Sequence, residues 1–178
     1  KRLGVTITYG VGVWPGFVQE QHPDHVIVAT GAEPQRPWWV PADAPNVMDV
    51  REVLSQPGSG PQPGDTVVVV DEIGFHHATS VAELLADRGC HVEIVTPGMV
   101  VGQDLGITLD MENWWMRAGA KGIVQSTDLV PMNFAGGELT LLHHPTGANQ
   151  TRRPDWVVLA VPANPADELY HQLKAAGV

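Results

Sequence analysis

One continuous β-branched run constrains the fold more than any other feature of this chain. Residues 66–70 read Thr-Val-Val-Val-Val, which is typical of a strand buried on both faces of a parallel sheet. A helical pattern follows over 79–88 and ends at Gly89, and a second apolar strand follows over 92–95. A strand, a helix and a strand within about 30 residues form a parallel βαβ crossover. The sequence therefore predicts an α/β fold built on a Rossmann-like parallel sheet, with three layers.

Shorter patterns predict the remaining elements. Alternating or apolar runs predict further strands, and amphipathic stretches predict further helices. The expected strands are 5–8, 11–14, 26–29, 123–126, 138–143 and 156–161, with a connection at 17–22, and the expected helices are 49–55, 108–118 and 166–176.

Composition excludes several classes of function. The 178 residues hold 10 Lys and Arg against 20 Asp and Glu, a net charge of −10, which repels nucleic acid and anionic lipid. No apolar run approaches the roughly 20 residues that span a bilayer. One cysteine, Cys90, cannot form an internal disulfide or a thiolate metal cluster. We therefore expect a cytoplasmic protein that binds neither nucleic acid nor membranes, and a homo-oligomer is left open.

The Pro and Gly content divides the chain. Residues 48–64 are rich in both and read as a linker between a first segment, 1–47, and a Rossmann-like segment, 65–154. Residues 155–178 then return to the first segment's domain. Leu3-Gly4 is typical of the end of a helix, and Val178 stands where another strand would begin. We expect that both ends lie inside a larger fold.

The loop after the strand at 66–70 is where a Rossmann unit holds a dinucleotide. Such a loop needs glycines that let the backbone approach the pyrophosphate, and a helix N-terminus that supplies N–H donors. Here the loop reads Asp71-Glu72-Ile73-Gly74-Phe75-His76-His77-Ala78, with one glycine and two carboxylates. Asp71 and Gly74 are the candidate contacts to a dinucleotide, but the carboxylates disfavour NAD(P).

Other chemistry-bearing residues have structural interpretations. His76 and His77 are adjacent and cannot chelate one metal ion together, and Cys90 has no nearby activating base, which favours a core role. Trp114 and Trp115 cannot share one helix face, so we expect one to be buried. The sequence predicts no catalytic residue and no metal ligand.

Two similar runs bracket the Rossmann-like unit. The first, Val26-Ile27-Val28-Ala29-Thr30-Gly31-Ala32-Glu33-Pro34, carries a strand into a small, tight turn that lets the backbone approach a ligand. The second is Asp155-Trp156-Val157-Val158-Leu159-Ala160-Val161-Pro162-Ala163-Asn164-Pro165. This bracketing resembles flavoproteins in which an NAD(P)-type domain is inserted into an FAD-type domain. Residues 67–97 look most like the C-terminal region of the old yellow enzyme-like iron–sulfur flavoenzymes. That family includes trimethylamine, dimethylamine and histamine dehydrogenases and 2,4-dienoyl-CoA reductase.

The resemblance implies roles for particular residues. Ala29, Thr30, Gly31 and Ala32 match the segment near the pyrophosphate of FAD or ADP, and Val13 matches a position whose backbone contacts adenine. The family's FAD-type GxGxxG motif and its barrel, which carries FMN, the catalytic residues and a 4Fe-4S cluster, lie outside this stretch. The resemblance therefore implies a partial FAD or ADP site whose partner is the remainder of a flavoenzyme, and a chain that is inactive alone.

Three hypotheses remain at this point. The first is a fragment of a flavin-dependent oxidoreductase that binds FAD or ADP and supports electron transfer. The second is a working NAD(P)H-binding domain that uses Gly74 and the helix near Ala78. The third is a non-enzymatic docking domain, which requires an exposed apolar patch around Trp114 or Trp38.

Overall fold

A five-stranded parallel sheet lies at the centre of residues 34–163. In the computed structural model, which describes residues 3–56 and 58–177, its strand order is β2-β9-β3-β4-β5. The strands are β2 (Val47–Asp49), β3 (Thr66–Asp71), β4 (His91–Val95), β5 (Val124–Ser126) and β9 (Trp156–Ala160). All neighbouring pairs are parallel, and β3 lies between β9 and β4, with its middle valines buried. The run that most constrained the fold is therefore a central strand.

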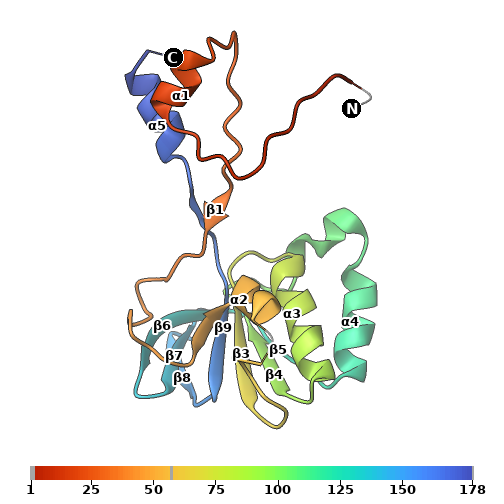
Figure 1. Ribbon diagram of the computed structural model, residues 1–178. Helices are drawn as coiled ribbons and strands as arrows, with labels where there is room; N and C mark the ends of the chain where they lie inside the picture. Colours follow the sequence, from red (N-terminus) through yellow and green to blue (C-terminus); the bar gives the residue numbers. More distant parts are fainter. Residues whose placement is uncertain (1–2, 57, 178) are drawn as a thin grey trace. The chain divides into compact units, whose positions relative to one another are not determined.

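Helices cover one face of this sheet. They are α2 (Val50–Ser55), α3 (His76–Asp87), the 3₁₀ helix η1 (Gln103–Thr108) and α4 (Met111–Ala120), and Figure 1 shows α3 and α4 side by side. The apolar core on this side joins Val69 and Ile94 of the sheet to Leu85 of α3 and Trp114 of α4. No helix among the described residues is long and apolar enough to cross a membrane.

A small antiparallel sheet covers the opposite face. It consists of β6 (Leu129–Ala135), β7 (Glu138–His143) and β8 (Ala148–Arg152), joined by short turns. Phe134 and Leu141 of this sheet pack with Val70 and Leu159 of the parallel sheet. The three layers, with the parallel sheet in the middle, confirm the predicted α/β fold.

The two ends of the chain form a second compact unit. Its described part holds residues 3–33 and 164–177, so residues 34–163 form one continuous unit between its two halves. Its elements are α1 (Pro15–Glu20), β1 (Ala32–Glu33), β10 (Asn164–Pro165) and α5 (Glu168–Ala175). β1 and β10 pair antiparallel, and α1 contacts α5, where Val18 and Leu173 are buried. We call these the end unit and the central unit.

Several predictions for the end unit are wrong. Residues 5–8, 11–14 and 26–29 form no strand, and the expected connection at 17–22 lies largely in α1. The apolar side chains of these segments, such as Ile7 and Ile27, are exposed. A strand requires a hydrogen-bonded neighbour, and among the described residues none pairs with these three segments.

The central unit departs less from expectation. The helix expected at 49–55 is α2, which starts with a capping box: Asp49 Oδ1 accepts from Arg51 N at 2.8 Å, and Asp49 N donates to Glu52 Oε2 at 2.7 Å. The helix expected at 108–118 is α4, preceded by η1. Of the antiparallel sheet, only the strand at 138–143 was expected.

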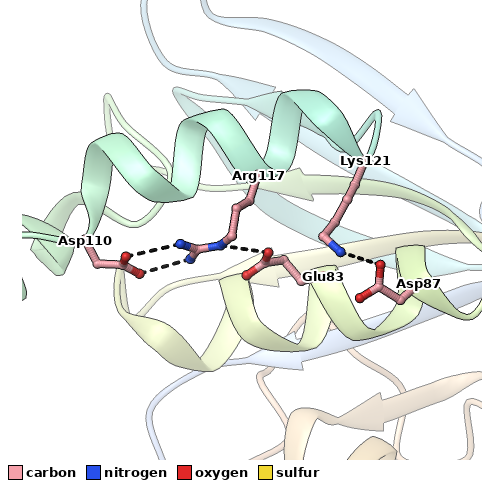
Figure 2. Close-up of polar contacts among 5 residues, drawn as sticks. All are labelled: Glu83, Asp87, Asp110, Arg117 and Lys121. Carbon is pink, nitrogen blue, oxygen red and sulfur yellow. Dashed lines mark hydrogen bonds and ion pairs between the residues drawn. The ribbon is translucent and has the colours of Figure 1, made fainter.

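An ion-pair network joins α4 to α3, as Figure 2 shows. Arg117 donates from Nε to Glu83 Oε1 at 2.9 Å, and its two terminal nitrogens donate to the two oxygens of Asp110 at 3.2 and 3.0 Å. Lys121 pairs with Asp87 one turn further along. The hydrogen bond from Arg117 holds the pKa of Asp110 below its usual range. Arg117 therefore fixes the start of its own helix and ties it to α3.

We expect Arg117→Leu to lower the melting temperature by roughly 2–4 °C, a typical effect for a partly exposed network in a chain of this size. Arg117→Lys keeps the positive charge but loses the bidentate contact with Asp110. Its melting temperature should therefore lie between those of wild type and Arg117→Leu. Because the pKa of Asp110 is lowered in the folded state, the network stabilises the fold fully at pH values above the usual Asp pKa. This stabilisation is lost as pH falls through the lowered pKa. The difference between wild type and Arg117→Leu should therefore shrink as pH falls toward 3 in circular dichroism melts. A difference that grows in acid would contradict this role.

Candidate functional site

The turn at Thr30 is fixed by contacts with the returning chain. The Thr30 hydroxyl donates to the carbonyl of Ala166, and Ala166 N donates to Gly31 O at 3.0 Å. Gly31 has a φ of +79°, a conformation that favours glycine. Next to it, β1 and β10 pair through Ala32 and Pro165. The predicted Ala-Thr-Gly turn is thus held against the second of the two bracketing runs.

A hollow of about 310 Å³ opens beside this turn. It is lined by Val26, Val28, Ala29, Thr30, Gly31, Pro165, Ala166, Asp167 and Tyr170. A Cβ built on Gly31 would meet no atom within 4 Å, so the backbone there is open to a ligand. Three of the candidate residues, Ala29, Thr30 and Gly31, are brought together here. Ala32 lies in β1, and Val13 is exposed and lies outside the helices and strands, and neither lines this hollow.

In the central unit, the candidate residue Asp71 binds its own loop. Its side chain is fully buried at the end of β3. Oδ1 accepts from Gly74 N at 2.8 Å and Ile73 N at 3.2 Å, and Oδ2 accepts from Gly102 N at 3.4 Å. Burial raises the pKa of Asp71, and the three N–H donors oppose that rise. The carboxylate therefore occupies backbone donors at the place where a Rossmann unit binds a phosphate.

Gly74 faces the neighbouring loop instead of open space. Its φ is +74°, and a Cβ built on it would lie 3.8 Å from Gln103 N and 3.9 Å from Asp104 N. Asp104 N also donates to Gly74 O at 2.8 Å, which joins the two loops. The adjacent hollow of about 310 Å³ is lined by Asp71, Glu72, Ile73, Gly74, Thr96, Pro97, Gly98, Val100 and Gln103, with no cation among them. This lining suits a pyrophosphate poorly.

The chain is similar to part of two longer proteins, although no family model matches it. It is 29% identical over 183 residues to N,N-dimethylglycine/sarcosine dehydrogenase of Chromohalobacter salexigens, covering 97% of this chain and 26% of the relative. It is 30% identical over 180 residues to "Probable N-methylproline demethylase" of Rhizobium meliloti, covering 98% of this chain and 26% of the relative. The chain thus spans about a quarter of the length of these relatives.

A solved structure agrees with the sequence relatives. The 6-hydroxypseudooxynicotine amine oxidase of Pseudomonas geniculata superposes with a TM-score of 0.81 at 29% identity, over 93% of this chain and 26% of that one. The chain is related to the flavin-dependent amine dehydrogenases. The resemblance to this dehydrogenase family is thereby confirmed, and a flavin is the cofactor that the relatives support.

In this relative of the amine dehydrogenases, the remaining residues that the sequence singled out make contacts that support the fold. His76 Nε2 lies 3.3 Å from the Thr108 hydroxyl, which ties α3 to η1. Cys90 is buried, and its thiol donates to Gln62 O at 3.3 Å. Trp114 is fully buried whereas Trp115 is 45% exposed, as their spacing predicted. A docking patch around Trp114 is therefore excluded, while Trp38 is exposed.

Sequence reasoning missed two contributors to these sites. Gly102 N reaches Asp71 from the loop after β4, and Ala166 holds Thr30 from the far end of the chain. Neither residue lies in a recognisable motif. A glycine that precedes a short helix, as Gly102 does, was the only available signal.

Proposed function

We propose that this chain is the nucleotide-binding region of a larger flavin-dependent amine dehydrogenase. In this proposal the end unit holds the ADP part of FAD, or ADP itself, at Ala29–Gly31, and the central unit supports that site without binding NAD(P). The observation that carries the proposal is the open turn at Gly31, because the corresponding turn of the central unit is filled by Asp71.

The residues at Gly31 fit a nucleotide in two respects. Small side chains at Ala29 and Gly31 leave the backbone accessible on the hollow's wall. The contacts of Thr30 and Ala166 fix the turn before any ligand arrives, which lowers the entropy cost of binding. Val13 and Ala32 remain proposed contacts from elsewhere in the end unit.

The exposed apolar segments of the end unit support the view that it is one part of a larger domain. Val5, Ile7 and Tyr9 are between 61% and 85% exposed, and Ile27 is 92% exposed. Apolar area of this extent usually marks a surface that another part of a protein covers. This chain spans about a quarter of its relatives' length, and we propose that the region corresponding to the other three quarters covers this surface.

For the whole enzyme we propose oxidation of an N-methylated amine, because the names of the two sequence relatives specify such substrates. A bound flavin would supply the two-electron oxidation. FMN and a 4Fe-4S cluster belong to the parts outside this chain in this proposal, since the chain has a single cysteine. We also propose that the enzyme is cytoplasmic and that this chain is inactive when isolated.

Calorimetric titration with ADP tests the proposed site. We expect saturable binding that Gly31→Ala weakens about tenfold, because alanine is strained at a φ of +79°. Gly147→Ala is the matched control, since Gly147 also has a positive φ, +67°, with no atom within 4 Å of a built Cβ, but lies in the central unit. The proposal fails if NADH binds in the micromolar range and Gly74→Ala abolishes that binding while Gly31→Ala does not.

A further inference from the structure

A third hollow, of about 510 Å³, lies at the amino ends of the parallel strands. Thr66 and His91, the first residues of β3 and β4, both line it, so it lies at the opposite strand ends from the Asp71 loop. Its volume is in the range typical of small-molecule sites. Its lining residues are Thr66, Val67, Val68, Cys90, His91, Val92, Glu93, Lys121, Gly122, Val124, Arg152, Arg153 and Pro154.

The charge of this lining is opposite to that of the chain. Three of the chain's 10 Lys and Arg line the hollow, against one carboxylate, that of Glu93, although the whole chain carries −10. Arg152 and Glu93 neutralise each other, because Arg152 Nε donates to both Glu93 oxygens at 3.0 and 2.8 Å. Lys121 and Arg153 are the two remaining cations of the lining.

Lys121 and Arg153 keep donors for a ligand. Each makes its ion pair with a carboxylate that does not line the hollow, Asp87 for Lys121 and Glu138 for Arg153. Asp87 is 60% exposed and Arg153 is 79% exposed, so water screens both pairs. An ammonium has three N–H donors and a guanidinium has five, which exceeds what one carboxylate partner accepts from each.

The wall of the hollow also includes an apolar surface. Val68, Glu93 and Val124 are neighbours in register across β3, β4 and β5, so their side chains point to the same sheet face. Val68 is 4% exposed, whereas Val124, on the edge strand, is 55% exposed. Pro154 adds a further apolar contact.

We propose that this hollow binds a small organic acid. Lys121 and Arg153 hold its carboxylate, and its apolar body lies on Val124 and Pro154. The proposal is independent of the nucleotide site, since every lining residue belongs to the central unit.

Sodium benzoate, followed by amide NMR shifts, tests this site. We expect saturable shifts at Gly122 and Val124, and at least a fivefold weaker affinity in the double variant Lys121→Gln/Arg153→Gln. Lys174→Gln is the control, because Lys174 lies in the end unit, above the Tyr170 ring. Val124→Glu places a like charge beside the ligand without touching either cation, and it should weaken benzoate comparably.

Two further probes separate charge from apolar contact. Inorganic phosphate carries the charge without the ring, and benzyl alcohol carries the ring without the charge, so each should bind at least fivefold more weakly than benzoate. The proposal is overturned if benzoate gives no saturable shift at Gly122 and Val124, if phosphate binds as well as benzoate, or if Lys174→Gln weakens benzoate as much as the double variant does.

Discussion

Replacement of Trp114 by alanine should lower the free energy of unfolding by about 3–5 kcal/mol, the range for deleting a large, fully buried side chain. Trp114 has no exposed surface and packs between α4 and the sheet, in the same core as Leu85, Ile94 and Leu105. Its indole N–H has no hydrogen-bond partner in the part of the chain that the structure describes. The loss therefore comes from packing alone, without a broken hydrogen bond.

The neighbouring Trp115 provides a matched control. It is 45% exposed on the same helix, so Trp115→Ala should cost about 1 kcal/mol or less. Trp114→Phe should cost much less than Trp114→Ala, because it keeps an aromatic ring and removes the unpartnered donor. Urea unfolding followed by circular dichroism measures all three without depending on tryptophan fluorescence. Equal losses for Trp114→Ala and Trp115→Ala would show that α4 does not pack as described.

The parallel sheet was predictable because each of its inner strands carries its own signal. The strand expected at 66–70 is observed as Thr66–Asp71, and the one expected at 156–161 is observed as Trp156–Ala160. Strands buried on both faces are apolar along their whole length, so no knowledge of the partner is needed to find them. The same signal places the dinucleotide-type loop directly after β3.

The strands that were wrongly predicted or missed depend on pairing partners that the local sequence does not specify. Residues 5–8 alternate as a strand would, yet they pair with no described strand. Conversely, Ala148–Arg152 is polar and carried no strand signal, but it pairs with β7 along its whole length. Pro131 obscured β6, and it lies where the pairing with β7 shifts register.

The candidate sites were only half predictable for the same reason. The carboxylates at 71 and 72 were visible in the sequence, and they led to the prediction that this loop disfavours a phosphate. The sequence did not reveal that the Asp71 carboxylate accepts hydrogen bonds from Gly74 N in its own loop and from Gly102 N, 31 residues further along the chain. Such contacts arise from packing of loops, which no local pattern encodes.

Asp71→Ala is the second substitution for which we expect a large effect. It would leave the N–H groups of Ile73, Gly74 and Gly102 without their acceptor, at a loss of about 2–4 kcal/mol in the free energy of unfolding. Asp71→Asn keeps an oxygen for Ile73 and Gly74 and loses only the longest contact, so it should cost less than half as much. Asp43→Asn makes the same change at an exposed position of the central unit and should change stability by less than about 0.5 kcal/mol.

The pH dependence of stability shows whether the folded state favours the protonated or the ionised side chain of Asp71. Burial raises the pKa of Asp71 in the folded state, so the folded chain holds this proton to higher pH than the unfolded chain does. Its contribution to stability is therefore complete below the usual Asp pKa and declines as pH rises through the raised value. Asp71→Asn cannot ionise and lacks this decline, so its stability relative to wild type should improve between about pH 3.5 and pH 7. Urea midpoints measured across that interval for wild type, Asp71→Asn and the exposed control Asp43→Asn decide the matter. A relative stability of Asp71→Asn that falls with rising pH would mean that the ionised carboxylate is favoured in the fold, with N–H donation outweighing burial.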